Sequence, residues 1–194
     1  MTMTRSDLEL ASDFVRRWKA LPNQRRGRLG KEFPAAAVQI AALSHSDLEV
    51  RRSCLFLLDH YASDASWDTF RRALRDPVAS VREVALHGLS CERCRSAALC
   101  VTDVVTDLIG ILARDPSAEV RHKTVAVLAR FVDRDARAGQ AIARAAQEDP
   151  DSAIRHVARH ISDSGQIHVR GRKAALRDTR RERDRRAAKE PRSL

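Results

Sequence analysis

Apolar and small residues recur at helical spacing in four stretches of the chain. From Val50, Val81, Val120 and Ile154, such a side chain follows about every fourth residue. This spacing places the side chains on one face of an α-helix. The predicted inward stripe consists of Val50, Cys54, Leu58, Val81, Ala85, Leu89, Val120, Thr124, Leu128, Ile154 and Ala158. We therefore predict one helix from each of the four starting points.

A short phrase precedes three of these predicted helices. It reads Asp-Pro, three further residues, and then Val-Arg or Ile-Arg, and it begins at Asp76, Asp115 and Asp149. A degenerate copy has His45 in the place of the aspartate and leads to Val50. An aspartate can cap the free amides of a helix start, and proline fits the first helical position because it has no N–H. Each phrase is therefore predicted to open a helix.

A second amphipathic segment lies upstream of each phrase. These segments cover roughly 34–44, 66–75, 101–114 and 136–148. Each unit is thus predicted to be a hairpin of two antiparallel helices joined at the Asp-Pro turn. The Val-Arg or Ile-Arg pairs are 31, 39 and 34 residues apart, and such periods are typical of stacked helical hairpins. The expected fold class is all-α.

The Asp-Pro and Val-Arg elements resemble the HEAT-repeat family, especially the short bacterial HEAT-like repeats of the phycobilisome-lyase type. The resemblance covers roughly 34–163 and implies an α-solenoid of about four stacked hairpins. It also implies a structural ladder of charges between neighbouring hairpins, formed by Asp76, Asp115, Asp149, Arg82, Arg121 and Arg155. Solenoids of this kind bind other macromolecules, but the fold does not identify the partner.

Two flanking segments complete the predicted organisation. Residues 1–33 are expected to form an N-terminal capping helix and a basic linker, with Leu10, Phe14 and Trp18 covering the open end of the stack. Residues 164–194 are expected to form an arginine-rich C-terminal arm, either helical or disordered. The length of 194 residues suits one repeat domain with such an arm.

The 39-residue interval holds three of the four cysteines. Cys91 and Cys94 form a Cys-x2-Cys pair and Cys100 follows six residues later, so the three thiolates could bind one soft cation, with Zn²⁺ as the first candidate. His87, one helical turn before Cys91, is the expected fourth ligand, and His60 is the alternative. Buried packing of these cysteines is an equally weighted interpretation, and an iron–sulfur cluster, a redox disulfide or thiol catalysis stays open.

Positive charge is concentrated at the C-terminal end. The formal net charge is +10, and residues 166–194 hold eleven Arg and Lys against four Asp and Glu. Such a segment can bind nucleic acid by neutralising phosphates, can bind an acidic protein, or can serve only solubility. The predicted second helices add outward basic residues, so the expected partner-binding set is Arg52, His122, Lys123, His156, Arg159, Arg180, Arg181, Arg185 and Arg186.

Catalytic motifs are missing from the sequence. It has no Gly-rich phosphate loop, no Gly-x-Ser-x-Gly and no His-Glu-x-x-His. We expect a non-enzymatic protein-interaction scaffold or adaptor, with nucleic-acid binding as the alternative and a DNA glycosylase-like or bilin lyase-like enzyme third. Cys54 lies in the inward stripe and is interpreted as a structural thiol. With no apolar run that could span a bilayer and no apolar stretch at the start, we expect a cytoplasmic protein.

Overall fold

The computed structural model describes residues 5–22, 30, 32–61, 66–90 and 101–163. All regular elements in these ranges are helices, and no strand is present among them. Within the same ranges, no helix has the length and apolar character needed to cross a membrane. The predicted all-α class is therefore confirmed for the described part of the chain.

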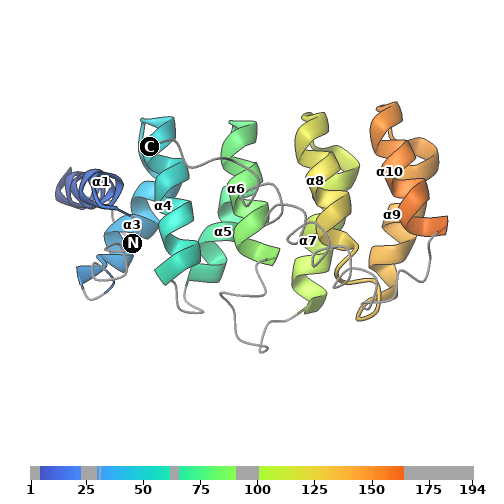
Figure 1. Ribbon diagram of the computed structural model, residues 1–194, viewed down its shortest axis with the longest axis horizontal. Helices are drawn as coiled ribbons and strands as arrows, with labels where there is room; N and C mark the ends of the chain where they lie inside the picture. Colours follow the sequence, from blue (N-terminus) through green and yellow to red (C-terminus); the bar gives the residue numbers. More distant parts are fainter. Residues whose placement is uncertain (1–4, 23–29, 31, 62–65, 91–100, 164–194) are drawn as a thin grey trace, which may run out of the picture.

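In the described part of the chain, helix α1 (Arg5–Ala20) is followed by four helical hairpins. Their first helices are α3 (Ala35–Ser44), α5 (Trp67–Ala73), α7 (Val101–Arg114) and α9 (Ala136–Glu148), and their second helices are α4 (Leu48–Tyr61), α6 (Ala79–Ser90), α8 (Ala118–Leu128) and α10 (Ser152–Asp163). Figure 1 shows the hairpins side by side in chain order. The second helices pack on one another in the order α4, α6, α8, α10. This packing is consistent with a helical repeat.

The predicted inward stripe forms the core between the hairpins. Its members are at most 2% exposed, apart from the half-buried Val50. Phe70 of α5 adds the largest fully buried side chain among the described residues and lies against Gly88 of α6. A Cβ atom at Gly88 would lie only 2.1 Å from a Phe70 ring carbon. The glycine therefore allows α5 and α6 to pack closely around the phenyl ring.

The Asp-Pro turns differ from the sequence prediction. Asp115 Oδ1 accepts a hydrogen bond from the backbone N–H of Ser117 at 2.9 Å, and Asp76 and Asp149 make the same contact two residues ahead. The helices begin only after these turns, and Ser117 caps α8 by accepting from the backbone N–H of Val120. The prediction that the aspartate caps the helix, with proline at its first position, is therefore wrong. The carboxylate closes the turn before the helix instead.

Helix α1 covers the N-terminal end of the hairpins by packing on α3 and α4. Phe14 and Trp18 are buried as predicted, at 2% and 8% exposure. Leu10 is 51% exposed, so its predicted capping role is wrong. The helix instead turns Ala11, together with Val15, toward the core. Because Leu10 lies about 100° around the helix from Ala11, it points away from that contact.

Candidate interaction surfaces

Buried arginine–aspartate pairs join the Asp-Pro turns of neighbouring hairpins. Arg82 donates from Nε and Nη2 to the two carboxylate oxygens of Asp115, both at 2.7 Å. Its Nη1 donates to the backbone carbonyl of Asp76, in its own turn, at 2.8 Å. The Arg82 and Asp115 side chains are only 8% and 2% exposed. One guanidinium group thus fixes two successive turns to each other through charge-assisted hydrogen bonds.

The same arrangement recurs on both sides of this pair. Arg51 donates to Asp76 at 3.0 and 3.4 Å, and Arg121 donates to Asp149 at 2.9 and 3.1 Å. The ladder thus starts at Arg51, one repeat earlier than the resemblance implied. Arg155 donates only to backbone carbonyls, at 2.6 Å to that of Asp149, and pairs with no carboxylate in the described ranges. The predicted pairing role is confirmed for Arg82 and Arg121 but not for Arg155.

The ladder also sets the protonation of its charged groups. Burial alone would raise the pKa of Asp149, but hydrogen bonds from Arg121 and from the backbone N–H of Asp151 hold that pKa below its usual value. Hydrogen bonding to Asp115 raises the pKa of Arg82, and hydrogen bonding to Asp149 raises that of Arg121. These charges are satisfied within the fold, which supports a structural role.

A row of exposed and half-buried side chains runs across the second helices. We call it the second-helix face, and it comprises Arg52, Phe56, His60, Glu83, His87, His122, Lys123, His156, Arg159 and His160. Each second helix contributes at least one exposed histidine to it. Toward α8 and α10 this face carries mainly basic and imidazole side chains. It is thus the part of the described surface where the predicted partner-binding residues meet.

The structure distinguishes among those predicted residues. His122, His156 and Arg159 are exposed on α8 and α10. Lys123 of α8 is exposed but forms an ion pair with Glu83 of α6. The half-buried Arg52 donates to Glu49 on its own helix at 3.0 Å. The remaining members of the predicted set, Arg180, Arg181, Arg185 and Arg186, lie outside the described residues.

Phe56 is a member of this face that the sequence interpretation missed. Its side chain lies on α4 and is 39% exposed. The ring centroid lies 4.4 Å from that of His60 and 5.5 Å from that of Trp18. The repeat register could have placed Phe56 on this face, because Phe56 aligns with His87 of the next repeat. An aromatic group thus lies at the α4 end of the face, opposite its basic end.

The predicted metal ligands lie in different places. Cys91, Cys94 and Cys100 are outside the described residues, so the thiolate site stays a prediction. His60 Nδ1 lies 3.1 Å from the backbone carbonyl of Phe56, on its own helix. In the described ranges, no group of three or more His, Cys, Asp or Glu side chains is placed to hold a metal ion. His87 lies beside a residue of α4 that the sequence interpretation did not consider.

That neighbour is Asp59 of α4. Its Oδ2 lies 3.4 Å from Nε2 of His87, across the contact between α4 and α6. Asp59 is 3% exposed, and its Oδ1 has no hydrogen-bond partner in the described part of the chain. The sequence shows that this aspartate is unusual, because in the repeat register Asp59 aligns with Ser90 of the next repeat and with Ala129 of the one after it. An acidic residue at such a buried position is unusual.

Cys54 behaves as the inward stripe predicts. It is 0% exposed, and its thiol is free. Burial raises the pKa of this thiol to about 12. Since the thiolate is the reactive form of cysteine, this group is poorly suited to nucleophilic or redox chemistry. The structural interpretation of Cys54 is therefore supported.

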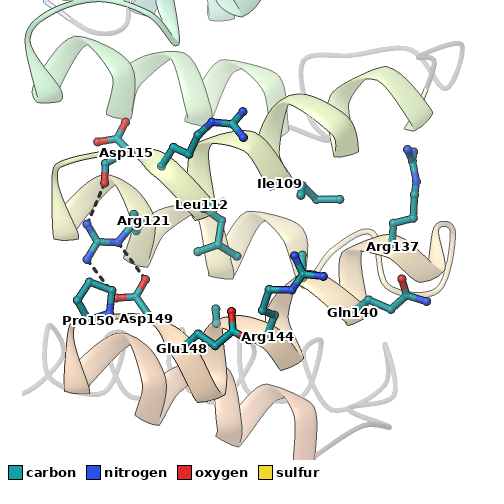
Figure 2. Close-up of a pocket in the computed structure, with 14 residues that line it drawn as sticks. Ile109, Leu112, Asp115, Arg121, Arg137, Gln140, Arg144, Glu148, Asp149 and Pro150 are labelled. Atoms are coloured by element: carbon teal, nitrogen blue, oxygen red, sulfur yellow. Dashed lines mark hydrogen bonds and ion pairs between the residues drawn. The ribbon is translucent and has the colours of Figure 1, made fainter.

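A groove of about 530 Å³ lies between the first helices α7 and α9. Figure 2 shows Ile109 and Leu112 along it, with Arg137 and Arg144 on its α9 side and the Arg121–Asp149 pair at one end. Small residues of α9, including two alanines, leave this space open. The groove combines apolar and basic groups and could accept a side chain from a partner. It is shorter than the second-helix face, since it involves only two of the hairpins.

No protein-family model matches the sequence, and no curated protein matches it.

Proposed function

We propose that this chain is a non-enzymatic, HEAT-like repeat protein that acts as a protein-interaction scaffold and binds its partner across the second-helix face. The observation that supports this most directly is the continuity of that face over four hairpins whose turns are tied by buried ion pairs. A surface made of repeated units and extended over several of them is typical of solenoid binding proteins.

The ladder supports binding by holding the face in one arrangement. Arg51, Arg82 and Arg121 each connect their own turn to the next one through a guanidinium group, which is buried in Arg82 and Arg121 and half-buried in Arg51. The spacing between neighbouring second helices is therefore fixed before a partner arrives. A preorganised surface loses less conformational entropy on binding, so more of the contact energy contributes to affinity.

The chemistry of the face indicates the kind of partner. Phe56, in tilted ring contact with His60, provides an aromatic anchor of the type that dominates many interfaces. His156 and Arg159, at the α10 end, favour acidic groups. The proposed partner is thus a protein that presents an apolar side chain and acidic residues to the same surface.

Site-specific photo-crosslinking in the native host tests the proposal. A photoreactive amino acid is placed at Phe56 or at His156, and control positions are the exposed Arg72 and Gln147 on first helices. We expect one protein to be captured from both face positions and from neither control position. Its affinity for the purified chain should then fall at least tenfold in F56A/R159E and stay unchanged in R72E. Capture from all four positions, or equal affinity of both variants, would reject the second-helix face as the interface.

Nucleic-acid binding is the second candidate, favoured by the basic end of the face and by the eleven Arg and Lys of residues 166–194. Binding by phosphate neutralisation weakens steeply with salt. Titration of labelled RNA and DNA oligonucleotides at several salt concentrations, with the full chain and with residues 166–194 deleted, tests it. Strong salt dependence that is lost in the deletion supports this function, and no saturable binding at low salt excludes it.

A further inference from the structure

The last arginine of the sequence phrase, Arg155, is held in the same way as the arginines of the ladder. Its Nη1 donates to the backbone carbonyls of Asp149 and Pro150, at 2.6 and 3.0 Å. Arg82 makes the two equivalent contacts in its own turn, at 2.8 and 3.1 Å. Because the guanidinium group is planar and rigid, these bonds fix the orientation of Arg155 as they fix that of Arg82.

The opposite edge of this guanidinium group, formed by Nε and Nη2, is filled in the inner repeats. In Arg82 these two atoms donate to the two oxygens of Asp115, both at 2.7 Å. Arg51 and Arg121 bind the aspartate of the following turn through the same two atoms. In Arg155 neither atom donates to a group in the described part of the chain. A fork that its third nitrogen already holds in place is suited to bidentate binding of a carboxylate.

The position four residues after the arginine changes from apolar to basic at this end of the stack. Leu55, Leu86 and Val125 hold it in the first three repeats and are at most 1% exposed. Arg159 holds it in the last repeat and is exposed. It lies one helical turn after Arg155 and therefore on the same side of α10. The end of the stack thus favours acidic groups over a further apolar hairpin.

A second copy of this chain does not offer the matching group, an aspartate at a turn. The aspartates of the phrase, Asp76, Asp115 and Asp149, are each bound by an arginine of their own chain. At the N-terminal end, His45 stands in the place of the aspartate, and α1 packs on α3 and α4. The occupant that fits is therefore a different protein.

We propose that the α10 end of the stack binds an acidic turn of a partner protein. The Nε–Nη2 edge of Arg155 takes an aspartate carboxylate, and Arg159 takes a second acidic side chain. The partner's turn thereby continues the arginine–aspartate ladder beyond the last hairpin. Arg155 is not a member of the second-helix face, so this site can be tested apart from that proposed interface. A single ion pair that is open to solvent contributes little affinity, so an isolated turn should bind weakly.

Nuclear magnetic resonance of the full, isotope-labelled chain tests the site, because the Nε–H signal of each arginine reports its own guanidinium group. The probe is a capped peptide with the sequence of residues 112–119, which contains the turn that Arg82 binds within the fold. We expect a saturable shift of the Arg155 signal. The signals of Arg82 and Arg121 should stay unchanged, since their carboxylates are already in place. R155K keeps the charge but not the fork, and should bind at least tenfold more weakly by the amide signals of α10.

The matched ligand control is the same peptide carrying Asp115→Asn, which should also bind at least tenfold more weakly. It leaves the protein unchanged, so it stays decisive whatever R155K does to folding. R72E, on the first helix α5, and F56A, on the second-helix face, should bind the peptide as the wild type does. An Arg155 signal that does not move at millimolar peptide would overturn the proposal. Equal binding of the asparagine peptide, or an equal shift with inorganic phosphate, would overturn it as well.

Discussion

Arg82 and Asp115 are separated by 33 residues in the chain, and their side chains form two hydrogen bonds of 2.7 Å between neighbouring hairpins. Both side chains are buried, and the same arginine also binds the backbone carbonyl of Asp76 in its own turn. The recurring Asp and Arg of the sequence phrase thus act in different repeats. The arginine of one repeat binds the aspartate of the next, so the phrase stabilises the stacking of hairpins as well as their turns.

Removing this arginine should destabilise the protein strongly. R82A leaves the buried Asp115 carboxylate without its partner, and we expect the free energy of unfolding to fall by about 3–5 kcal/mol. The matched control is R155A, because Arg155 makes the same carbonyl contacts but has no carboxylate partner among the described residues. That change should cost about 0.5–1.5 kcal/mol. Urea unfolding followed by circular dichroism measures the free energy of unfolding of both variants. Equal losses of stability in R82A and R155A would contradict the expected contribution of the ion pair.

The ladder should also make stability depend on acid pH. The pKa of Asp149 is lower in the folded protein than its usual value, because the Arg121 and backbone hydrogen bonds outweigh the effect of burial. Its stabilising contribution is therefore complete above the unfolded pKa of about 3.9 and is lost as pH falls through the lower folded pKa. D149N should be less stable than the wild type at pH 7, with the difference shrinking below about pH 4. Urea unfolding of both proteins from pH 2.5 to 7 measures the difference, and a constant gap would refute the linkage.

A methyl group at Gly88 should disturb the contact between α5 and α6. In G88A the added Cβ would lie 2.1–2.7 Å from three carbons of the Phe70 ring, and overpacking of this kind costs about 1–3 kcal/mol. G139A in α9 is the control, because nothing lies within 4 Å of its added Cβ. It should stabilise the protein by up to about 1 kcal/mol through helix propensity. Thermal unfolding compares the two, and G88A/F70L should recover part of the loss if the clash is its cause.

The helices were predictable because their signal is local. Apolar and small side chains at every fourth position place Val81, Ala85 and Leu89 on one face, and that face is buried. The 31 to 39 residue period gives the hairpins in the same way, so the predicted first helices agree with α3, α5, α7 and α9 within about two residues.

Contacts between hairpins were harder to predict, because they depend on how one repeat is placed on the next. The approach of Asp59 to His87 follows from the stacking of α4 on α6, and the sequence interpretation considered His87 only as a neighbour of Cys91. Arg51 was missed as a ladder member for a related reason. Its own repeat lacks the turn aspartate, but the arginine uses the aspartate of the following repeat, Asp76.

Cys54 should be unreactive as long as the protein is folded. Burial raises the pKa of its thiol to about 12, so only about one thiol in ten thousand is ionised at pH 8, and the group is 0% exposed. In the C91S/C94S/C100S variant, which keeps Cys54 as its single cysteine, a chromogenic disulfide reagent should report almost no free thiol at pH 8. One thiol per chain should appear after guanidinium denaturation. Because modification then requires opening of the core, its rate should rise in R82A in step with the loss of stability. Rapid labelling of the folded variant would show that this part of α4 is open to solvent, and it would contradict the buried structural role.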